Sequence, residues 1–227
     1  MAVPKGELVG QGIGSPDGAG PHANIYLRRT EFDGKAYEAP TWEQMGIYTF
    51  ELARQIIDSG QSFDRVIAFA KGGWTWSRTL VDYLAIKQMS SIRAESYKDN
   101  IKLQKPRIIQ PLTDAVGGER VLLFDEVIDS GDTTQLGLDY VGVMGAKDIK
   151  IATLCYKPDF SKVVPDFYAF TSNAWVFFPH EVREFVEGRA DEWRPQGLTD
   201  AQILDRLVEI GAQRNQAEYF LALTRHE

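Results

Sequence analysis

Cysteine is almost absent from this chain of 227 residues: Cys155 is the single one, so no internal disulfide can form. A cysteine without a partner is typical of a reducing compartment, and we therefore expect a cytoplasmic protein. No run of 18 apolar residues occurs, which predicts that no segment spans a membrane. The opening residues, MAVPKGELVGQG, contain no apolar core segment, so we expect no signal peptide.

Basic residues and histidines are also scarce or scattered. The 25 Lys and Arg residues against 32 Asp and Glu give a formal net charge of −7, which argues against a nucleic-acid-binding surface. The three histidines, His22, His180 and His226, are far apart and form no metal-ligand pattern. Hydrophobic residues make up 44% of the chain, enough for the core of one domain with appendages.

The most informative segment is the string VLLFDEVIDSGDTT at 121–134. Its apolar start predicts a buried parallel strand, after which Asp125 and Glu126 follow. Beyond Asp129 the chain enters a helical pattern, and the backbone N–H groups at a helix start bind anions. The small and hydroxyl-bearing residues at that start are Ser130, Gly131, Asp132, Thr133 and Thr134. Carboxylates beside an anion site repel the anion unless they hold sugar hydroxyls or a bridging Mg²⁺. The alternative is an ordinary strand, loop and capped helix.

Three regions are expected along the chain. Residues 1–40 form a Gly-rich extension, of which we expect 1–22 to be loop. Residues 41–188 alternate between helical and strand patterns, with strands expected at 66–70, 92–97, 121–125, 149–156, 167–170 and 175–178. Residues 189–227 form a helical tail, with helices around 200–210 and 214–223. The tail's apolar face packs either on its own domain or at a subunit interface.

Strands separated by helices predict an α/β fold with a parallel sheet. Ligands of such sheets bind at the carboxyl ends of the strands, and the 125–134 segment lies there. Lys71, Gly72 and Gly73 follow another predicted strand in the same way. Their glycines let backbone amides approach an oxyanion closely, and the lysine adds positive charge, although a plain turn is the alternative.

The 121–134 segment resembles the phosphoribosyl-pyrophosphate (PRPP) signature of the type I phosphoribosyltransferases. That signature is an apolar strand, two acids, two or three apolar residues, then Asp, Ser or Thr, Gly, a variable residue and Thr. The resemblance covers 41–188 and is greatest to the bacterial and archaeal enzymes for the 6-oxopurines xanthine, hypoxanthine and guanine. It implies a parallel sheet flanked by helices, a small base-binding hood within 41–188 and a helical C-terminal tail.

The resemblance also assigns roles. It implies that Asp125 and Glu126 position the ribose hydroxyls and hold Mg²⁺, directly or through ribose or water, while Asp129 is the general base for the purine. It implies that residues 130–134 bind the 5′-phosphate of PRPP. It further implies that Lys71, Gly72 and Gly73 bind pyrophosphate, with a cis peptide bond before Lys71.

For the base, the resemblance implies a hydrogen bond from Lys157 to the purine O6. It implies stacking of the purine on Trp175 and a backbone contact from Val176. Ser96 and Tyr97 match a mobile loop over the active site, with a solvated polar loop as the alternative. The sequence departs from the family at Asp132, where many relatives have Gly or Lys, and we expect its side chain to point outward. Glu126 replaces an Asp but keeps the carboxylate.

The resemblance thus implies a purine phosphoribosyltransferase of purine salvage, a homodimer or homotetramer that uses PRPP, a purine base and Mg²⁺. Two alternatives stay open. One is a regulatory protein that keeps the PRPP fold without turnover, and the other is a phosphoribosyltransferase for a different base. The net charge, together with Asp129, Lys157 and Trp175, favours the purine enzyme.

Overall fold

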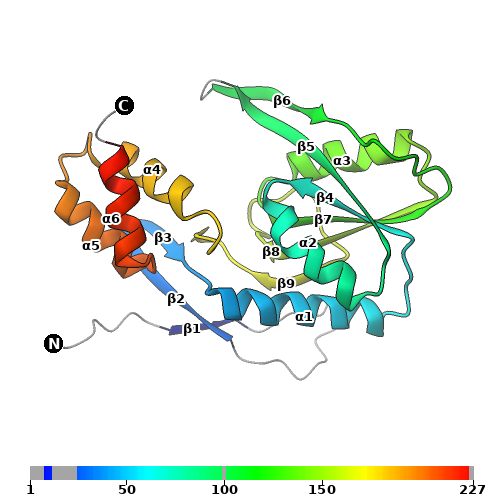
Figure 1. Cartoon of the computed structure of the whole chain (residues 1–227), viewed down its shortest axis with the longest axis horizontal. Helices are drawn as coiled ribbons and strands as arrows, with labels where there is room; N and C mark the ends of the chain where they lie inside the picture. The colour runs from blue at the N-terminus through cyan, green and yellow to red at the C-terminus, as the bar shows by residue number, and fades with distance from the viewer. Residues whose placement is uncertain (1–7, 12–24, 99–100, 225–227) are drawn as a thin grey trace. The chain divides into compact units, whose positions relative to one another are not determined.

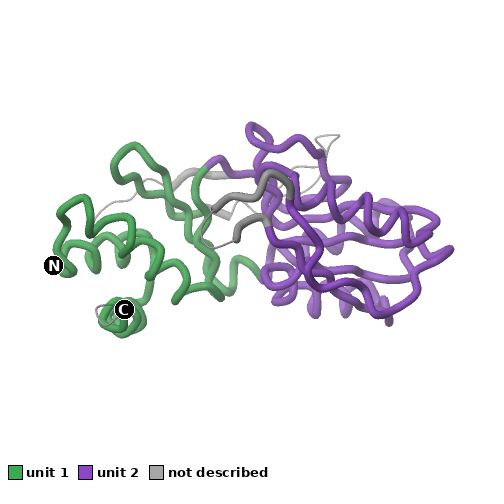
Figure 2. Tube along the Cα trace, turned by 90° about the horizontal axis from the view of Figure 1, so that it is seen from above, with its two compact units in different colours: residues 1–11, 24–45, 174–227 green, residues 12–23, 46–173 purple. Residues whose placement is uncertain are grey.

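A computed structural model describes residues 8–11, 25–98 and 101–224 of the chain. The chain divides into two compact units, each built from separated stretches of sequence (Figure 2). One groups residues 12–23 and 46–173, and we call it the sheet unit. The other groups residues 1–11, 24–45 and 174–227, and we call it the tail unit. The chain passes from the tail unit to the sheet unit inside helix α1 (Trp42–Asp58) and returns after Asn173.

The sheet unit contains a six-stranded sheet in the order β6-β5-β4-β7-β8-β9 (Figure 1). The strands are β4 (Arg65–Ala70), β5 (Gln88–Lys98), β6 (Ile101–Gln110), β7 (Arg120–Ile128), β8 (Asp148–Tyr156) and β9 (Phe167–Thr171). All neighbouring pairs are parallel except β5 and β6, which form an antiparallel hairpin at one edge. The expected α/β fold with a mainly parallel sheet is therefore confirmed, with one antiparallel edge strand added.

Helices cover both faces of this sheet. Helix α3 (Asp132–Val143) lies on one face, and α1 and α2 (Gly72–Tyr83) lie on the other (Figure 1). Alternate residues along a strand therefore point to opposite faces of the sheet, one covered by α3 and the other by α1 and α2. Ile67, Phe69, Val121 and Leu123 share a cluster with Val141 of α3. Burial on both faces explains why β4 and β7 are continuous apolar runs rather than alternating ones.

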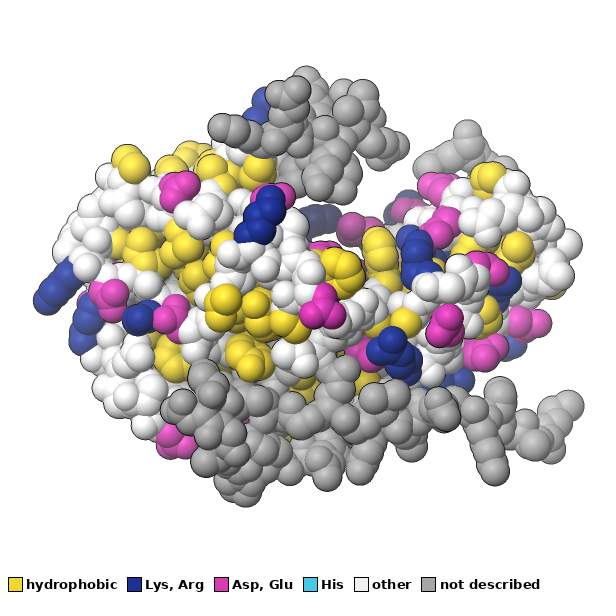
Figure 3. Space-filling view, turned by 180° about the vertical axis from the view of Figure 1, so that it is seen from behind, with side chains coloured by type: hydrophobic (Ala, Val, Ile, Leu, Met, Phe, Trp, Pro, Cys, Tyr) yellow, Lys and Arg dark blue, Asp and Glu magenta, His cyan; other side chains and the backbone are white. Residues whose placement is uncertain are grey.

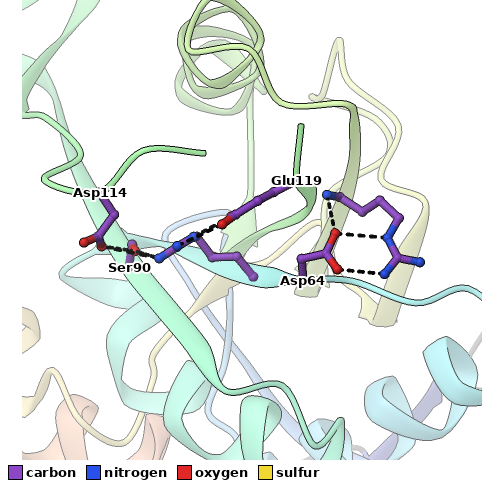
Figure 4. Close-up of polar contacts among 6 residues, drawn as sticks. Asp64, Ser90, Asp114 and Glu119 are labelled. Carbon is purple, nitrogen blue, oxygen red and sulfur yellow. Dashed lines mark hydrogen bonds and ion pairs between the residues drawn. The ribbon is translucent and has the colours of Figure 1, made fainter. Parts of the chain in front are cut away.

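Ion pairs fasten the amino ends of β4 and β7, at the edge opposite the predicted site (Figure 4). The guanidinium of Arg65 donates to both carboxylate oxygens of Glu119 at 2.7 and 3.0 Å, and it reaches Ser90 and Asp114. One residue before β4, Asp64 accepts from the backbone and side chain of Arg120, the first residue of β7. These contacts hold the register in which β4 and β7 run side by side.

The tail unit joins the two ends of the chain. Its sheet has the order β1-β2-β3-β10, from β1 (Leu8–Gln11), β2 (Ile25–Phe32), β3 (Lys35–Glu38) and β10 (Trp175–Val176). Three helices follow, α4 (Val182–Trp193), α5 (Asp200–Ile210) and α6 (Arg214–Leu223). The shared core contains Tyr37, Phe177, Phe185 and Trp193 with aliphatic residues of α5 and α6. The tail helices thus bury part of their apolar faces, including Ile203, Leu207 and Leu221, against the N-terminal hairpin, while Tyr219 and Leu223 are exposed.

Several elements differ from the expectations. The region around Ser96 and Tyr97, expected to be a short strand and a loop, belongs to the long arm β5 of the β5–β6 hairpin. Helix α2 begins at Gly72, directly after Lys71, and β10 has two residues where four were expected. Helix α4 was not expected before residue 190. The functional boundaries at 40 and 188 stay a prediction.

Acidic and basic side chains are interspersed on the face of the molecule seen in Figure 3. This mixed pattern agrees with the scattered charges of the sequence. Among the helices of the described residues, none is long and apolar enough to cross a membrane.

Candidate functional site

The acid pair Asp125–Glu126 lies inside strand β7, which continues to Ile128 and pairs with β8 as far as Tyr156. Glu126 is 7% exposed, while Asp125 is partly buried and its Oδ1 accepts the backbone N–H of Glu126 at 2.9 Å. Burial, and next to it the neighbouring carboxylate of Glu126, raise the pKa of Asp125 well above its ordinary value. A cation or hydrogen-bond donors beside this pair would therefore stabilise its charged form.

Lys71 is the N-cap residue of helix α2, whose first residues, Gly72 and Gly73, pack directly on this acid pair. The Ala70–Lys71 peptide bond is cis, as the sequence predicted. A Cβ added at Gly72 would lie 2.1 Å from Oε1 of Glu126, and one at Gly73 would lie 3.1 Å from the backbone oxygen of Phe124. A side chain at Gly72 would require the Glu126 carboxylate to move, so the start of α2 and the acid pair form one surface at the carboxyl ends of β4 and β7.

Helix α3 begins at Asp132 with Gly131 as its N-cap residue. Gly131 has φ 79°, and a Cβ there would lie 3.0 Å from the Ser161 hydroxyl and 3.1 Å from the Val163 side chain. Glycine is therefore required both for the backbone angle and for the close approach of the 161–163 segment. Thr133 and Thr134 occupy the first turn of α3, and Thr134 is buried. The predicted phosphate cradle is thus a helix N-terminus whose N–H groups favour an anion.

Asp132, the unexpected acid in this cradle, has a cation beside it. Its Oδ1 lies 3.1 Å from Nζ of Lys162, and its Oδ2 accepts the Ser130 hydroxyl at 3.1 Å. The backbone N–H of Lys162 also donates to the Ser130 backbone oxygen. Both side chains reach solvent, while Oδ2 stays on the hydroxyl of Ser130 within the cradle, and the outward orientation of Asp132 stays a prediction. Sequence reasoning missed Lys162, since its partner lies 30 residues away.

Asp129 and Lys157, assigned separately to the purine, are in contact. Nζ of Lys157 donates to Oδ2 of Asp129 at 3.2 Å. Asp129 follows β7 and Lys157 follows β8, and these strands are parallel neighbours. The backbone N–H of Lys157 also donates to the oxygen of Ile128, which fixes the turn after β8. An acid and a base with a shared hydrogen bond thus stand at the carboxyl ends of adjacent strands.

The remaining predicted residues belong to other elements. Trp175 and Val176 form β10 in the tail unit, where Trp175 is 46% exposed and Val176 is buried. The Arg189 guanidinium lies 4.7 Å from the Trp175 ring centroid, a contact that sequence reasoning missed. Ser96 and Tyr97 lie in β5, and their side chains are outside the described residues.

The acid pair can take part in holding a metal but cannot enclose one. In the described part of the chain, no three His, Cys, Asp or Glu residues are grouped for a metal ion. Mg²⁺ usually keeps several waters and binds through one or two carboxylates together with substrate phosphates. Two adjacent carboxylates, with the start of α2 packed on them, fit that mode.

Comparison with known proteins supplies the family. The family model for the Phosphoribosyl transferase domain matches residues 41–184. A xanthine-guanine phosphoribosyltransferase of Gluconobacter oxydans is 27% identical over 146 residues, covering 63% of this chain and 83% of that protein.

Solved structures agree. A purine phosphoribosyltransferase from Pyrococcus horikoshii is similar with a TM-score of 0.57 and 33% identity, over 63% of this chain and 93% of that one. A hypoxanthine-guanine phosphoribosyltransferase from Bacillus anthracis has a TM-score of 0.50 and 26% identity, over 58% of this chain and 79% of that one. These matches agree with the predicted type I phosphoribosyltransferase family and with its α/β fold.

Proposed function

The chain belongs to the phosphoribosyl transferase domain family, and from this premise we propose that it is a purine phosphoribosyltransferase of purine salvage. It transfers the 5-phosphoribosyl group from PRPP to a 6-oxopurine, giving the nucleoside monophosphate and pyrophosphate. The observation that carries the proposal is the 3.2 Å contact between Lys157 and Asp129 beside the cradle at Gly131. A general base and a hydrogen-bond donor so placed suit a purine, which offers an N–H to one and an oxygen to the other.

The anionic parts of PRPP find two receiving surfaces in the sheet unit. The start of α3, with Thr133 and Thr134, receives the 5′-phosphate through backbone N–H groups and hydroxyls. The loop at Lys71, packed on Glu126, receives the pyrophosphate. Holding both ends aligns C1′ with the incoming base, and alignment alone removes several kcal/mol, of order 7–11 in favourable cases, from a barrier.

Charge develops as the bond from C1′ to pyrophosphate breaks and the sugar becomes a cation. The carboxylates of Asp125 and Glu126 hold the ribose hydroxyls and would hold Mg²⁺ that arrives with PRPP. When bound, the ion neutralises the leaving pyrophosphate. Asp129 takes the proton from the attacking purine nitrogen, and Lys157 donates to the purine O6.

Trp175 supplies a stacking surface for the base, and Val176 supplies a backbone acceptor for it. Ser96 and Tyr97 belong to a segment that closes over the site.

The test is a pyrophosphate-release assay with PRPP, Mg²⁺ and a panel of bases. Release with guanine, xanthine or hypoxanthine, and none with adenine, uracil or orotate, is the expected result. Release only with adenine, uracil or orotate would show that the protein is a phosphoribosyltransferase for that base. No release with any base, from a folded protein that binds PRPP, would favour a regulatory protein. Asp129→Asn, which keeps the size of the side chain, serves as the matched inactive control.

We further propose a homodimer or homotetramer in the cytoplasm, which the family resemblance and the lone, buried Cys155 support. Sedimentation of the purified protein tests the assembly, and a mass of 25.5 kDa in solution would contradict it.

A further inference from the structure

Trp175 is supported by residues from both ends of the chain. In the tail unit, β10 runs parallel to β3 with Trp175 opposite Tyr37. The Arg189 guanidinium carbon, from helix α4, lies 4.7 Å from the Trp175 ring centroid, and Nζ of Lys35, from β3, lies 5.6 Å from it. Both separations are within the range in which a cation is attracted to an aromatic ring. Nearly half of Trp175 is nonetheless exposed, so the ring keeps surface for a ligand.

A single carboxylate ties the two cations together. Glu192 accepts Nζ of Lys35 at 2.7 Å through Oε1 and Nη1 of Arg189 through Oε2. Arg189 also donates to the Tyr37 hydroxyl at 3.3 Å, and it is 7% exposed. A guanidinium so buried and so paired has few alternative rotamers, and it therefore restricts the ring against which it lies.

These supports lie outside the part of the chain that matches the family. The family match covers residues 41–184, which include Trp175. Lys35 and Tyr37 precede it, and Arg189 and Glu192 follow it. The N-terminal hairpin and helix α4 thus converge on the one residue of β10 that is half exposed.

We infer that Arg189 is a positioning residue for base recognition: it fixes the Trp175 indole in the orientation in which the purine stacks on it. The inference rests on the proposed function, in which Trp175 contacts the base. A ring held before the ligand arrives loses little conformational freedom on binding, so its preorganisation raises affinity for the base. PRPP, bound in the sheet unit by other residues, gains nothing from it.

The test compares Arg189→Met, which keeps a long side chain but no charge, with Arg189→Lys, which keeps the charge but not the planar group. We expect KM for guanine to rise about three- to tenfold in Arg189→Met. In Arg189→Lys, which keeps the charge, we expect it to rise about two- to threefold. KM for PRPP and kcat are expected to stay within about twofold of the wild type.

Arg206→Met is the matched control, because the Arg206 guanidinium stacks in the same unit on Trp193 and Phe32, at 5.3 and 4.9 Å, and not on Trp175. Its KM for guanine is expected to be unchanged. A folded Arg189→Met with unchanged KM for guanine overturns the inference. Equal shifts for guanine and PRPP, or an equal shift in Arg206→Met, overturn it as well. If Arg189→Met does not fold, the same criteria apply to Arg189→Lys.

The wild-type assay separates this inference from the function on which it rests. Wild-type protein that releases no pyrophosphate with any base contradicts the proposed function. Wild-type protein that turns over guanine, with an Arg189 variant that binds it equally well, contradicts only the role of Arg189.

Discussion

Nζ of Lys162 lies 3.1 Å from Oδ1 of Asp132, at the start of the helix that forms the predicted phosphate cradle. An acid at this point repels a phosphate, and the lysine offsets that charge. Because both side chains reach solvent, the pair itself stabilises the fold by no more than about 0–1 kcal/mol. Its importance is therefore expected in PRPP binding rather than in folding.

Lys162→Ala is expected to raise KM for PRPP about three- to tenfold, since it leaves Asp132 uncompensated beside the 5′-phosphate. Steady-state kinetics at varied PRPP measures this, and the effect should shrink as salt is added. Asp132→Asn in the same chain is expected to restore most of the loss. Lys150→Ala is the control, as Lys150 pairs with Asp166 near the amino end of β8. An unchanged KM in Lys162→Ala would show that Asp132 does not face the phosphate.

Asp129→Ala is expected to lower kcat by about 10²–10⁴-fold, the usual loss when a general base is removed. PRPP binding should survive, because Asp129 does not belong to the phosphate or pyrophosphate surfaces. Calorimetric titration of PRPP into the variant, beside the pyrophosphate-release assay, measures both. Lys157→Met is the companion variant: it removes the 3.2 Å partner of Asp129 and should raise KM for the base. Turnover of Asp129→Ala at the wild-type rate would refute the assignment.

Gly72→Ala tests whether the Lys71 loop must lie on the acid pair. The added methyl would stand 2.1 Å from Oε1 of Glu126, whose side chain is buried. We expect KM for PRPP to rise at least tenfold, because either the loop or the carboxylate must shift. Gly142→Ala in α3 is the control, since its methyl meets nothing within 4 Å and an alanine there stabilises a helix by about 1 kcal/mol. Equal activity in the two variants would mean that the loop adapts without consequence.

The order of strands and helices in the sheet unit could be predicted because its signals are local. Apolar runs mark β4, β7 and β8, and the capping-box pattern at Thr41 marks the start of α1, where Gln44 and Thr41 exchange the expected hydrogen bonds. The site could be predicted in part for the same reason, because the parallel strands bring their carboxyl ends, and with them Asp129 and Lys157, to one edge.

What the sequence did not reveal depends on contacts between distant residues. The strand expected at 92–97 lies within β5, but its full length from Gln88 to Lys98 depends on pairing with β4 and β6. Helix α4 has a polar composition, and its buried face is defined by the hairpin at Tyr37 and by the helices α5 and α6 that pack on it. Lys162 and Arg189 carry no motif, since each acquires its role from a partner elsewhere in the chain.

The ion pair between Asp64 and Arg120, at the amino ends of β4 and β7, predicts how the stability of the fold depends on pH. Hydrogen bonds from the side chain and then the backbone of Arg120 hold the pKa of Asp64 well below its ordinary range. A carboxyl whose pKa is lower in the folded than in the unfolded state binds fewer protons when folded. Its contribution to stability is therefore present above the unfolded pKa, about 3.9, and is lost as the pH falls from there toward the folded value.

We expect Asp64→Asn to have a lower urea midpoint than the wild type at pH 6, and the difference between the two to shrink steadily below about pH 4. The reason is that protonated Asp64 no longer attracts Arg120 more strongly than an amide does. Arg120→Met, which removes the partner, should show the same convergence, and Asp64→Asn added to it should have little further effect. Urea melts of the four proteins between pH 6 and pH 2.5 measure this. A difference that stays constant over that range would show that the Asp64–Arg120 contact contributes through packing and not through charge.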